Sequence, residues 1–163
     1  MLIITTRGYE QTKWWGEKLG KCLEKGDIVC LIGGLGAGKT TFSQGVAKGL
    51  EVADKSILSP TFLMLREYHQ ARLPLFHFDL YRLESVTQLY DLGYEEYFFG
   101  DGVTLIEWAD KAEELIPSEY LKVEISWIDQ NSREINFIPY GEHYQEIVKH
   151  LKGIGHIRPI SNN

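Results

Sequence analysis

The sequence has 163 residues, 44% of them hydrophobic, which suits one domain with a full core and is short for two. Its formal net charge is −6 and it has no basic stripe, which argues against unaided, high-affinity binding of nucleic acid. No apolar run approaches the length of a membrane span, about 18 residues, and the N-terminus lacks a secretory leader. We therefore expect a cytoplasmic protein with no membrane contact.

The chain opens with a short β-branched segment and then an amphipathic one. Residues 2–5 are predicted to form an edge strand. In residues 9–24, apolar side chains recur with a period near 3.6, which predicts a helix with its tryptophans toward the core. The two cysteines, Cys22 and Cys30, show no metal-ligand spacing and are predicted to be reduced thiols.

An apolar run at residues 28–32 lies between glycine-containing turns. It is too short for a buried helix, so we predict a strand covered on both faces, as in a parallel sheet. The residues that follow fit G-x-x-x-x-G-K-[ST], a loop whose backbone N–H groups surround phosphate oxygens and whose glycines permit positive φ. The residues of this predicted phosphate loop are Gly33, Gly34, Leu35, Gly36, Ala37, Gly38, Lys39, Thr40 and Thr41.

Lys39 and Thr40 carry the chemistry of this motif. The loop is predicted to open a helix that runs to about residue 49, whose free N–H groups and dipole also favour an anion. Lys39 would lie beside the β- and γ-phosphates of a nucleotide, and the Thr40 hydroxyl would ligate a bridging Mg²⁺. The alternative is a glycine-rich turn without a ligand, which the complete motif disfavours.

A proline-containing segment follows this helix. Pro60 disfavours helix at Ser59, so residues 56–62 are predicted to be an extended connection. Thr61 in this connection is in a position to reach the metal or the γ-phosphate, as in switch loops that order around a nucleotide. An ordinary polar loop is the alternative.

Residues 62–68 and 74–81 are predicted to form two strands of an antiparallel hairpin. A period of two places His77 and Asp79 on one face of the second strand, which makes that face more polar than a core needs. Asp79, at the strand end, is the better functional candidate. A single buried residue such as His77 is more often a hydrogen-bonded structural residue.

A second apolar strand is predicted at residues 103–106, after a short helix at 84–92 and an aromatic and acidic link to residue 100. This strand runs directly into Glu107. In P-loop proteins an acid at such a strand end lies across the Mg²⁺ from the hydroxyl of the phosphate loop. Glu107 is therefore the second candidate metal ligand.

The rest of the chain is predicted to complete one α/β domain, P-loop NTPase-like, with a mixed, mostly parallel sheet flanked by helices. We place this P-loop domain at residues 1–155 and a flexible tail at 156–163. His143 and His150 are expected on solvated helix positions. The remaining predicted elements are a helix at 109–115, strands at 121–127 and 133–138, and a helix at 142–151.

Four segments together resemble the TsaE (YjeE) family, bacterial P-loop ATPases needed to make threonylcarbamoyladenosine on tRNA. The resemblance covers roughly residues 5–135, with the segments in the family's order. It implies Mg²⁺-dependent ATP hydrolysis, slow without partners, and association with the TsaB and TsaD proteins, through which alone the chain would meet tRNA. The segments are GGLGAGKTT at 33–41, SPTF at 59–62, HFDLYR at 77–82 and IEW at 106–108.

The resemblance also implies roles for individual residues. It implies Lys39, Asp79 and Thr61 as catalytic residues, with Asp79 near the γ-phosphate and Thr61 as the switch threonine. It further implies the phosphate loop at 33–41, Thr40 and Glu107 as Mg²⁺ ligands, Trp108 as the tryptophan after the glutamate, and Thr12 near the base. One departure is that the family usually has Asp where this chain has Gly34, so a role of that acid in hydrolysis is in doubt here.

Two other functions fit the phosphate loop. A small-molecule P-loop kinase would need arginines on a closing lid, for which Arg66, Arg72 and Arg82 are candidates, although no lid insertion is evident. A nucleotide-regulated binding module is the second alternative. A guanine-specific version is disfavoured because the chain lacks an Asn-Lys-x-Asp segment.

Overall fold

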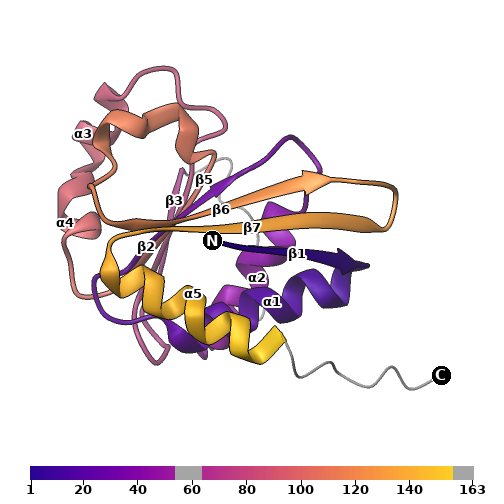
Figure 1. Cartoon of the computed structure of the whole chain (residues 1–163). Coiled ribbons are helices and arrows are strands. Elements are labelled where there is room, and N and C mark those ends of the chain that lie inside the picture. The colour runs from indigo at the N-terminus through magenta and orange to yellow at the C-terminus, as the bar shows by residue number, and fades with distance from the viewer. Residues whose placement is uncertain (54–63, 156–163) are drawn as a thin grey trace.

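The computed structural model describes residues 1–53 and 64–155. Its strands are β1 Leu2–Arg7, β2 Ile28–Ile32, β3 Leu65–Tyr68, β4 Leu75–Asp79, β5 Val103–Glu107, β6 Tyr120–Trp127 and β7 Ser132–Tyr140. They form one sheet in the order β1-β7-β6-β2-β5-β4-β3 (Figure 1). The four central strands are parallel, and β1, β7 and β3 pair antiparallel toward the edges. The predicted fold class is confirmed.

Helices cover both faces of this sheet (Figure 1). The helices are α1 Tyr9–Cys22, α2 Lys39–Gly49, α3 Thr87–Leu92, α4 Tyr94–Phe98, the 3-10 helix η1 Ala109–Leu115, and α5 Glu142–Gly155. Helices α1, α2 and α5 share one buried cluster, and α3, α4 and η1 pack in another on the opposite face. No helix in the described ranges is long and apolar enough to cross a membrane.

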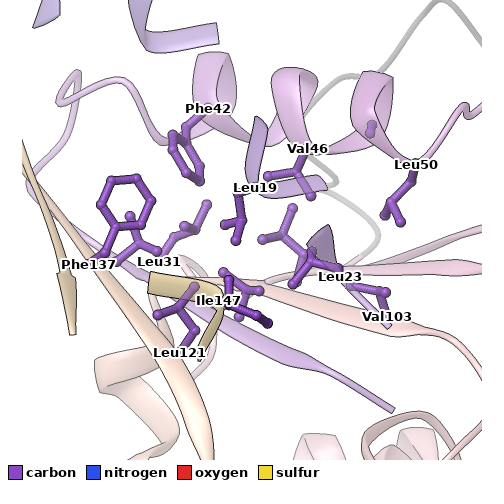
Figure 2. Packing of buried hydrophobic residues seen from close by; sticks show 14 of the residues in the cluster. Leu19, Leu23, Leu31, Phe42, Val46, Leu50, Val103, Leu121, Phe137 and Ile147 are labelled. Carbon is purple, nitrogen blue, oxygen red and sulfur yellow. The ribbon is translucent and has the colours of Figure 1, made fainter. Parts of the chain in front are cut away.

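Strand β2 lies at the centre and is buried on both faces, as predicted. Val29 and Leu31 belong to the cluster under α1 and α2, while Ile28 and Cys30 belong to the opposite one. Figure 2 shows Phe42, Val46 and Leu50 extending from α2 and its C-terminal end into the first cluster. These contacts fix β2 and α2, the two elements that flank the predicted phosphate loop.

Helix α1 and α2 approach each other closely through glycines. A Cβ on Gly16 would lie 2.3 Å from the carbonyl oxygen of Phe42, and one on Gly45 would lie 2.1 Å from that of Lys13. Gly20 and Gly49 are equally crowded by backbone atoms of the facing helix. The glycines that weaken the helical pattern of α1 are therefore required for its packing.

Several elements differ from the prediction. The link before residue 100 contains helix α4, which follows Gly93 in the left-handed region at φ 71°. Residues 109–115 form a 3-10 helix with a kink at Ala112 in place of a regular α-helix.

His143 lies on α5 with its side chain 38% accessible, as predicted for a solvated helix position, but it also has a buried partner. Its Nε2 lies 2.8 Å from Oδ1 of the buried Asp27, so it connects the first turn of α5 to the start of β2. Both cysteines are free thiols, in agreement with the sequence. The predicted connection at 56–62, with Thr61, and the predicted tail at 156–163 lie outside the described residues.

Candidate functional site

The predicted phosphate loop connects the end of β2 to the first turn of α2. Gly36 and Gly38 adopt positive φ, +74° and +109°, so these two positions need glycine for their backbone conformation. Gly33 has negative φ, and here glycine lets the loop backbone pack closely against β6. A Cβ at Gly33 would lie 2.5 Å from the carbonyl oxygen of Ile125. A Cβ on Gly34 would meet no atom within 4 Å.

Lys39 is folded back onto the loop that precedes it. Its Nζ donates to the carbonyl oxygens of Gly33, at 2.6 Å, and Gly34, at 2.7 Å. It also lies 4.1 Å from the centre of the Trp108 ring. Burial lowers the pKa of Lys39, and the charges of Glu107 and Asp79 oppose that shift. The loop therefore holds an ammonium group at its open side.

Two acids meet this loop at the carboxyl edge of the parallel strands. Asp79 ends β4 and Glu107 ends β5, and the two residues are paired across these neighbouring strands. The Thr40 hydroxyl, on α2, donates to Glu107 Oε1 at 3.3 Å. Asp79 Oδ1 accepts a hydrogen bond from the backbone N–H of Tyr81 at 2.9 Å. Three predicted site residues thus come from three elements to one sheet edge, where ligands collect in α/β folds.

A cavity of about 420 Å³ lies over this edge. It is lined by Leu35, Gly36, Ala37, Gly38, Lys39, Thr40, Thr41, Asp79, Tyr81, Glu107, Trp108 and Arg133. A smaller hollow of about 210 Å³ shares Gly38, Thr41 and Arg133 with it. The two hollows are therefore adjacent parts of one concave surface.

Thr12 lines the smaller hollow, on the side of α1. It is buried, and its hydroxyl lies 2.8 Å from that of Thr6 on β1. This pair holds α1 against the sheet edge beside Gly38. The predicted place of Thr12 near a nucleotide base stays a prediction.

The sequence did not predict Arg133 as a site residue. Its Nε donates to the carbonyl oxygen of Ala37 at 2.9 Å, and its Nη1 donates to that of Asp129, also at 2.9 Å. The guanidinium therefore joins the phosphate loop to the β6–β7 turn. An arginine at the start of a strand carries no local signal of this role, because the loop it contacts is remote in the sequence.

The oxygen ligands at this edge suit Mg²⁺. Mg²⁺ is usually bound by one or two protein oxygens, with waters and substrate phosphates completing an octahedron. Thr40 and Glu107 offer a hydroxyl and a carboxylate in contact with each other. Across residues 1–53 and 64–155, no group of three or more His, Cys, Asp or Glu side chains is placed to enclose a metal. The site thus fits a metal that arrives with phosphates.

A buried strand, a glycine loop and a helix that begins with Lys-Thr, beside acids on the adjacent parallel strands, define the P-loop NTPase fold. A sequence model described as threonylcarbamoyl adenosine biosynthesis protein TsaE matches residues 6–135. The chain belongs to the TsaE family, as the resemblance predicted.

Individual relatives agree with this assignment. The TsaE protein of Bacillus subtilis, named as a tRNA threonylcarbamoyladenosine biosynthesis protein, is 42% identical over 142 residues, which cover 87% of this chain and 88% of that protein. The protein of the same name from Treponema pallidum is 39% identical over 130 residues, or 80% and 95% of the two chains. The crystal structure of Bacillus subtilis YdiB superposes with a TM-score of 0.79 at 36% identity, covering 94% of this chain and 95% of that one.

Proposed function

We propose that this chain binds Mg-ATP in the cavity over the phosphate loop and hydrolyses it in the service of tRNA threonylcarbamoyladenosine formation. The observation that carries the proposal is the contact between Thr40 and Glu107 beside Asp79, at the open end of the loop. These residues are remote in sequence but adjacent in the fold, which supports a site where a triphosphate on the loop would present its metal. The family names of the relatives support the biological role.

Each residue has a distinct task in this proposal. The N–H groups of the loop and of the first turn of α2 bind phosphate oxygens, and Lys39 exchanges its two carbonyl partners for a phosphate, which is a stronger acceptor. Thr40 and Glu107 hold Mg²⁺, which when bound neutralises phosphate charge. Asp79 orients the attacking water. Thr12 borders the hollow that would take the base.

We also propose that the modification chemistry itself belongs to TsaB and TsaD, the partners implied by the resemblance. The chain is acidic, with a formal charge of −6, and is poorly suited to tRNA phosphates. The role of this chain would be to time the docking of the partners. Thr61 would link the γ-phosphate of ATP to docking, and hydrolysis would release the partners and reset the complex. Partner affinity must then differ between the ATP and ADP forms, since a ligand shifts an equilibrium only by its differential affinity.

The kinase alternative loses one of its candidate arginines. Arg72 Nη2 donates to the carbonyl oxygens of Gly20 and Leu23, each at 2.9 Å, so its guanidinium caps the C-terminal end of α1. A residue committed to a helix end does not close over a nucleotide. The nucleotide-regulated binding module differs from our proposal only in lacking hydrolysis.

The test is ATP and GTP binding and hydrolysis by the purified chain, with and without TsaB and TsaD, in Mg²⁺ and in EDTA. We expect preference for ATP, Mg²⁺-dependent hydrolysis, and faster turnover with both partners. Asp79→Asn should lower turnover about 100-fold and leave ATP affinity nearly unchanged, since it removes the carboxylate that orients the attacking water and no phosphate contact. Tight ATP binding without hydrolysis in any mixture would favour the binding module.

A further inference from the structure

The carboxylate of Glu107 is held from two sides. Oε1 accepts a hydrogen bond from the Thr40 hydroxyl, and Oε2 lies 3.0 Å from Nε2 of His77. Because a carboxylate oxygen accepts, the imidazole nitrogen is the donor. His77 and Glu107 are 0% and 1% exposed, so water does not compete for this second contact.

His77 contacts Glu107 from a position that does not border the proposed nucleotide site. It lies two residues before Asp79 on β4 and is paired with the buried Leu105 of β5. It is not among the residues that line the cavity of about 420 Å³. Its influence on any ligand would therefore pass through Glu107.

The imidazole is a poor choice for a purely structural residue. Its second nitrogen, Nδ1, is buried and has no hydrogen-bond partner in the described part of the chain. Buried polar atoms are normally paired, and an unpaired one destabilises a fold. A core position beside Leu105 would be filled better by an apolar side chain, so the contact with Glu107 is what the histidine adds.

We propose that His77 is a positioning residue that helps to fix the plane of the Glu107 carboxylate and so turns Oε1 toward Thr40 and the metal. The last torsion of a glutamate is broad, so each contact at a carboxylate oxygen narrows its range. The contact at Oε2 restricts the plane from the side opposite to Oε1. Mg²⁺ demands near-ideal octahedral geometry, which makes its binding sensitive to such orientation. This inference rests on the proposed Mg-ATP function.

Two matched variants test it. Gln places an amide nitrogen as many bonds from Cα as Nε2 of histidine, whereas Asn is one bond shorter, and both are neutral and polar. The measurement is ATP affinity across a Mg²⁺ titration and in EDTA, with thermal unfolding as the check on folding. We expect His77→Gln to keep the wild-type Mg²⁺ requirement and His77→Asn to raise it about 10- to 100-fold, with EDTA affinity unchanged in both.

Three outcomes would count against the proposal in different ways. A wild-type protein whose ATP affinity does not respond to Mg²⁺ would overturn the proposed function and, with it, this role. Equal Mg²⁺ requirements in the wild type and both variants would overturn the positioning role alone. So would a loss in His77→Asn that is as large in EDTA as in Mg²⁺. Should His77→Asn fail to fold, His77→Met, similar in volume and apolar, takes its place with the same expected shift.

Discussion

Glycines serve opposite purposes at the two ends of α2. Before its N-terminus, a Cβ on Gly34 or Gly36 would meet nothing within 4 Å, so the space beside these two positions is open. Near its C-terminus, a Cβ on Gly45 would lie 2.1 Å from a backbone oxygen of α1. The first region leaves room beside the loop backbone, and the second brings two backbones into contact.

The difference shows how the molecule supports its site. A binding loop works only if its N–H groups are held in place, which requires rigid flanking elements. Helix α2 supplies one of these elements, and its glycine contacts with α1 fix where its N-terminus lies. Substitutions in the two regions should accordingly separate function from stability.

Lys39→Ala should give the largest effect in the loop region. It removes the one cation of the phosphate motif, so we expect ATP binding or hydrolysis to fall by about 100-fold or more. The protein should still fold, because Lys39 belongs to neither hydrophobic cluster, although its contacts with the Gly33 and Gly34 carbonyls and the Trp108 ring are lost. Lys149→Ala, at an exposed position of α5 whose side chain is 79% accessible, is the matched control. Undiminished hydrolysis in a folded Lys39→Ala protein would refute the assigned role.

Gly45→Ala should give the opposite result. Its Cβ would collide with the Lys13 carbonyl, and we expect a loss of about 1–3 kcal/mol in the free energy of unfolding, as for overpacked cores. Gly153→Ala in α5, where a Cβ would meet no atom, should instead stabilise by about 0.5–1 kcal/mol through helix propensity. Denaturant unfolding of both variants makes the comparison. Equal changes would show that α1 and α2 do not depend on this contact.

These two regions also show what a sequence can reveal. The phosphate loop was predicted because its pattern is local and its chemistry is specific, and the strand ending in Glu107 was recognised once the loop was known. The packing role of Gly45 was invisible, since it depends on which helix faces α2. His77 was seen as a hydrogen-bonded residue, but its partner, Glu107, lies on another strand and follows only from the sheet register.

The misjudged elements have equally physical causes. Helix α4 has five residues, too few to display a helical period. Arg133 contacts a loop that is remote in the sequence, and a guanidinium bonded to carbonyl oxygens leaves no local pattern. The role of Arg133 was therefore missed because it is a tertiary contact, whereas α4 was missed because it is short.

Arg133→Ala tests how far the loop region depends on support from outside its motif. It removes the hydrogen bond from Nε to the Ala37 carbonyl, which braces the loop without belonging to its motif. We expect ATP affinity to fall about tenfold, the size of one charge-assisted hydrogen bond, with a smaller change in stability. Arg133→Lys should not restore affinity, because an ammonium lacks the fork that spans Ala37 and Asp129. If nucleotide titration showed that Arg133→Lys restores full affinity, the charge of Arg133 would explain its role and its hydrogen-bond geometry would not.

The smallest effect is expected at Gly34, where the TsaE family usually carries an aspartate. The position is exposed, its φ is not positive, and a side chain there would meet no neighbour. Gly34→Asp should therefore leave the free energy of unfolding within about 0.5 kcal/mol of wild type. ATP binding through backbone N–H groups should survive, so any change in turnover reports the acid itself.

Gly38→Asp is the control for that substitution. Its φ of +109° lies outside the left-handed region that aspartate tolerates, and such strain destabilises by about 1–3 kcal/mol. Thermal unfolding and hydrolysis of the two variants, measured side by side, separate a loop position that needs glycine from one that does not. If Gly34→Asp were as destabilising as Gly38→Asp, the space beside Gly34 could not be open in solution. Gly34 would then be a crowded position, like the glycines between α1 and α2.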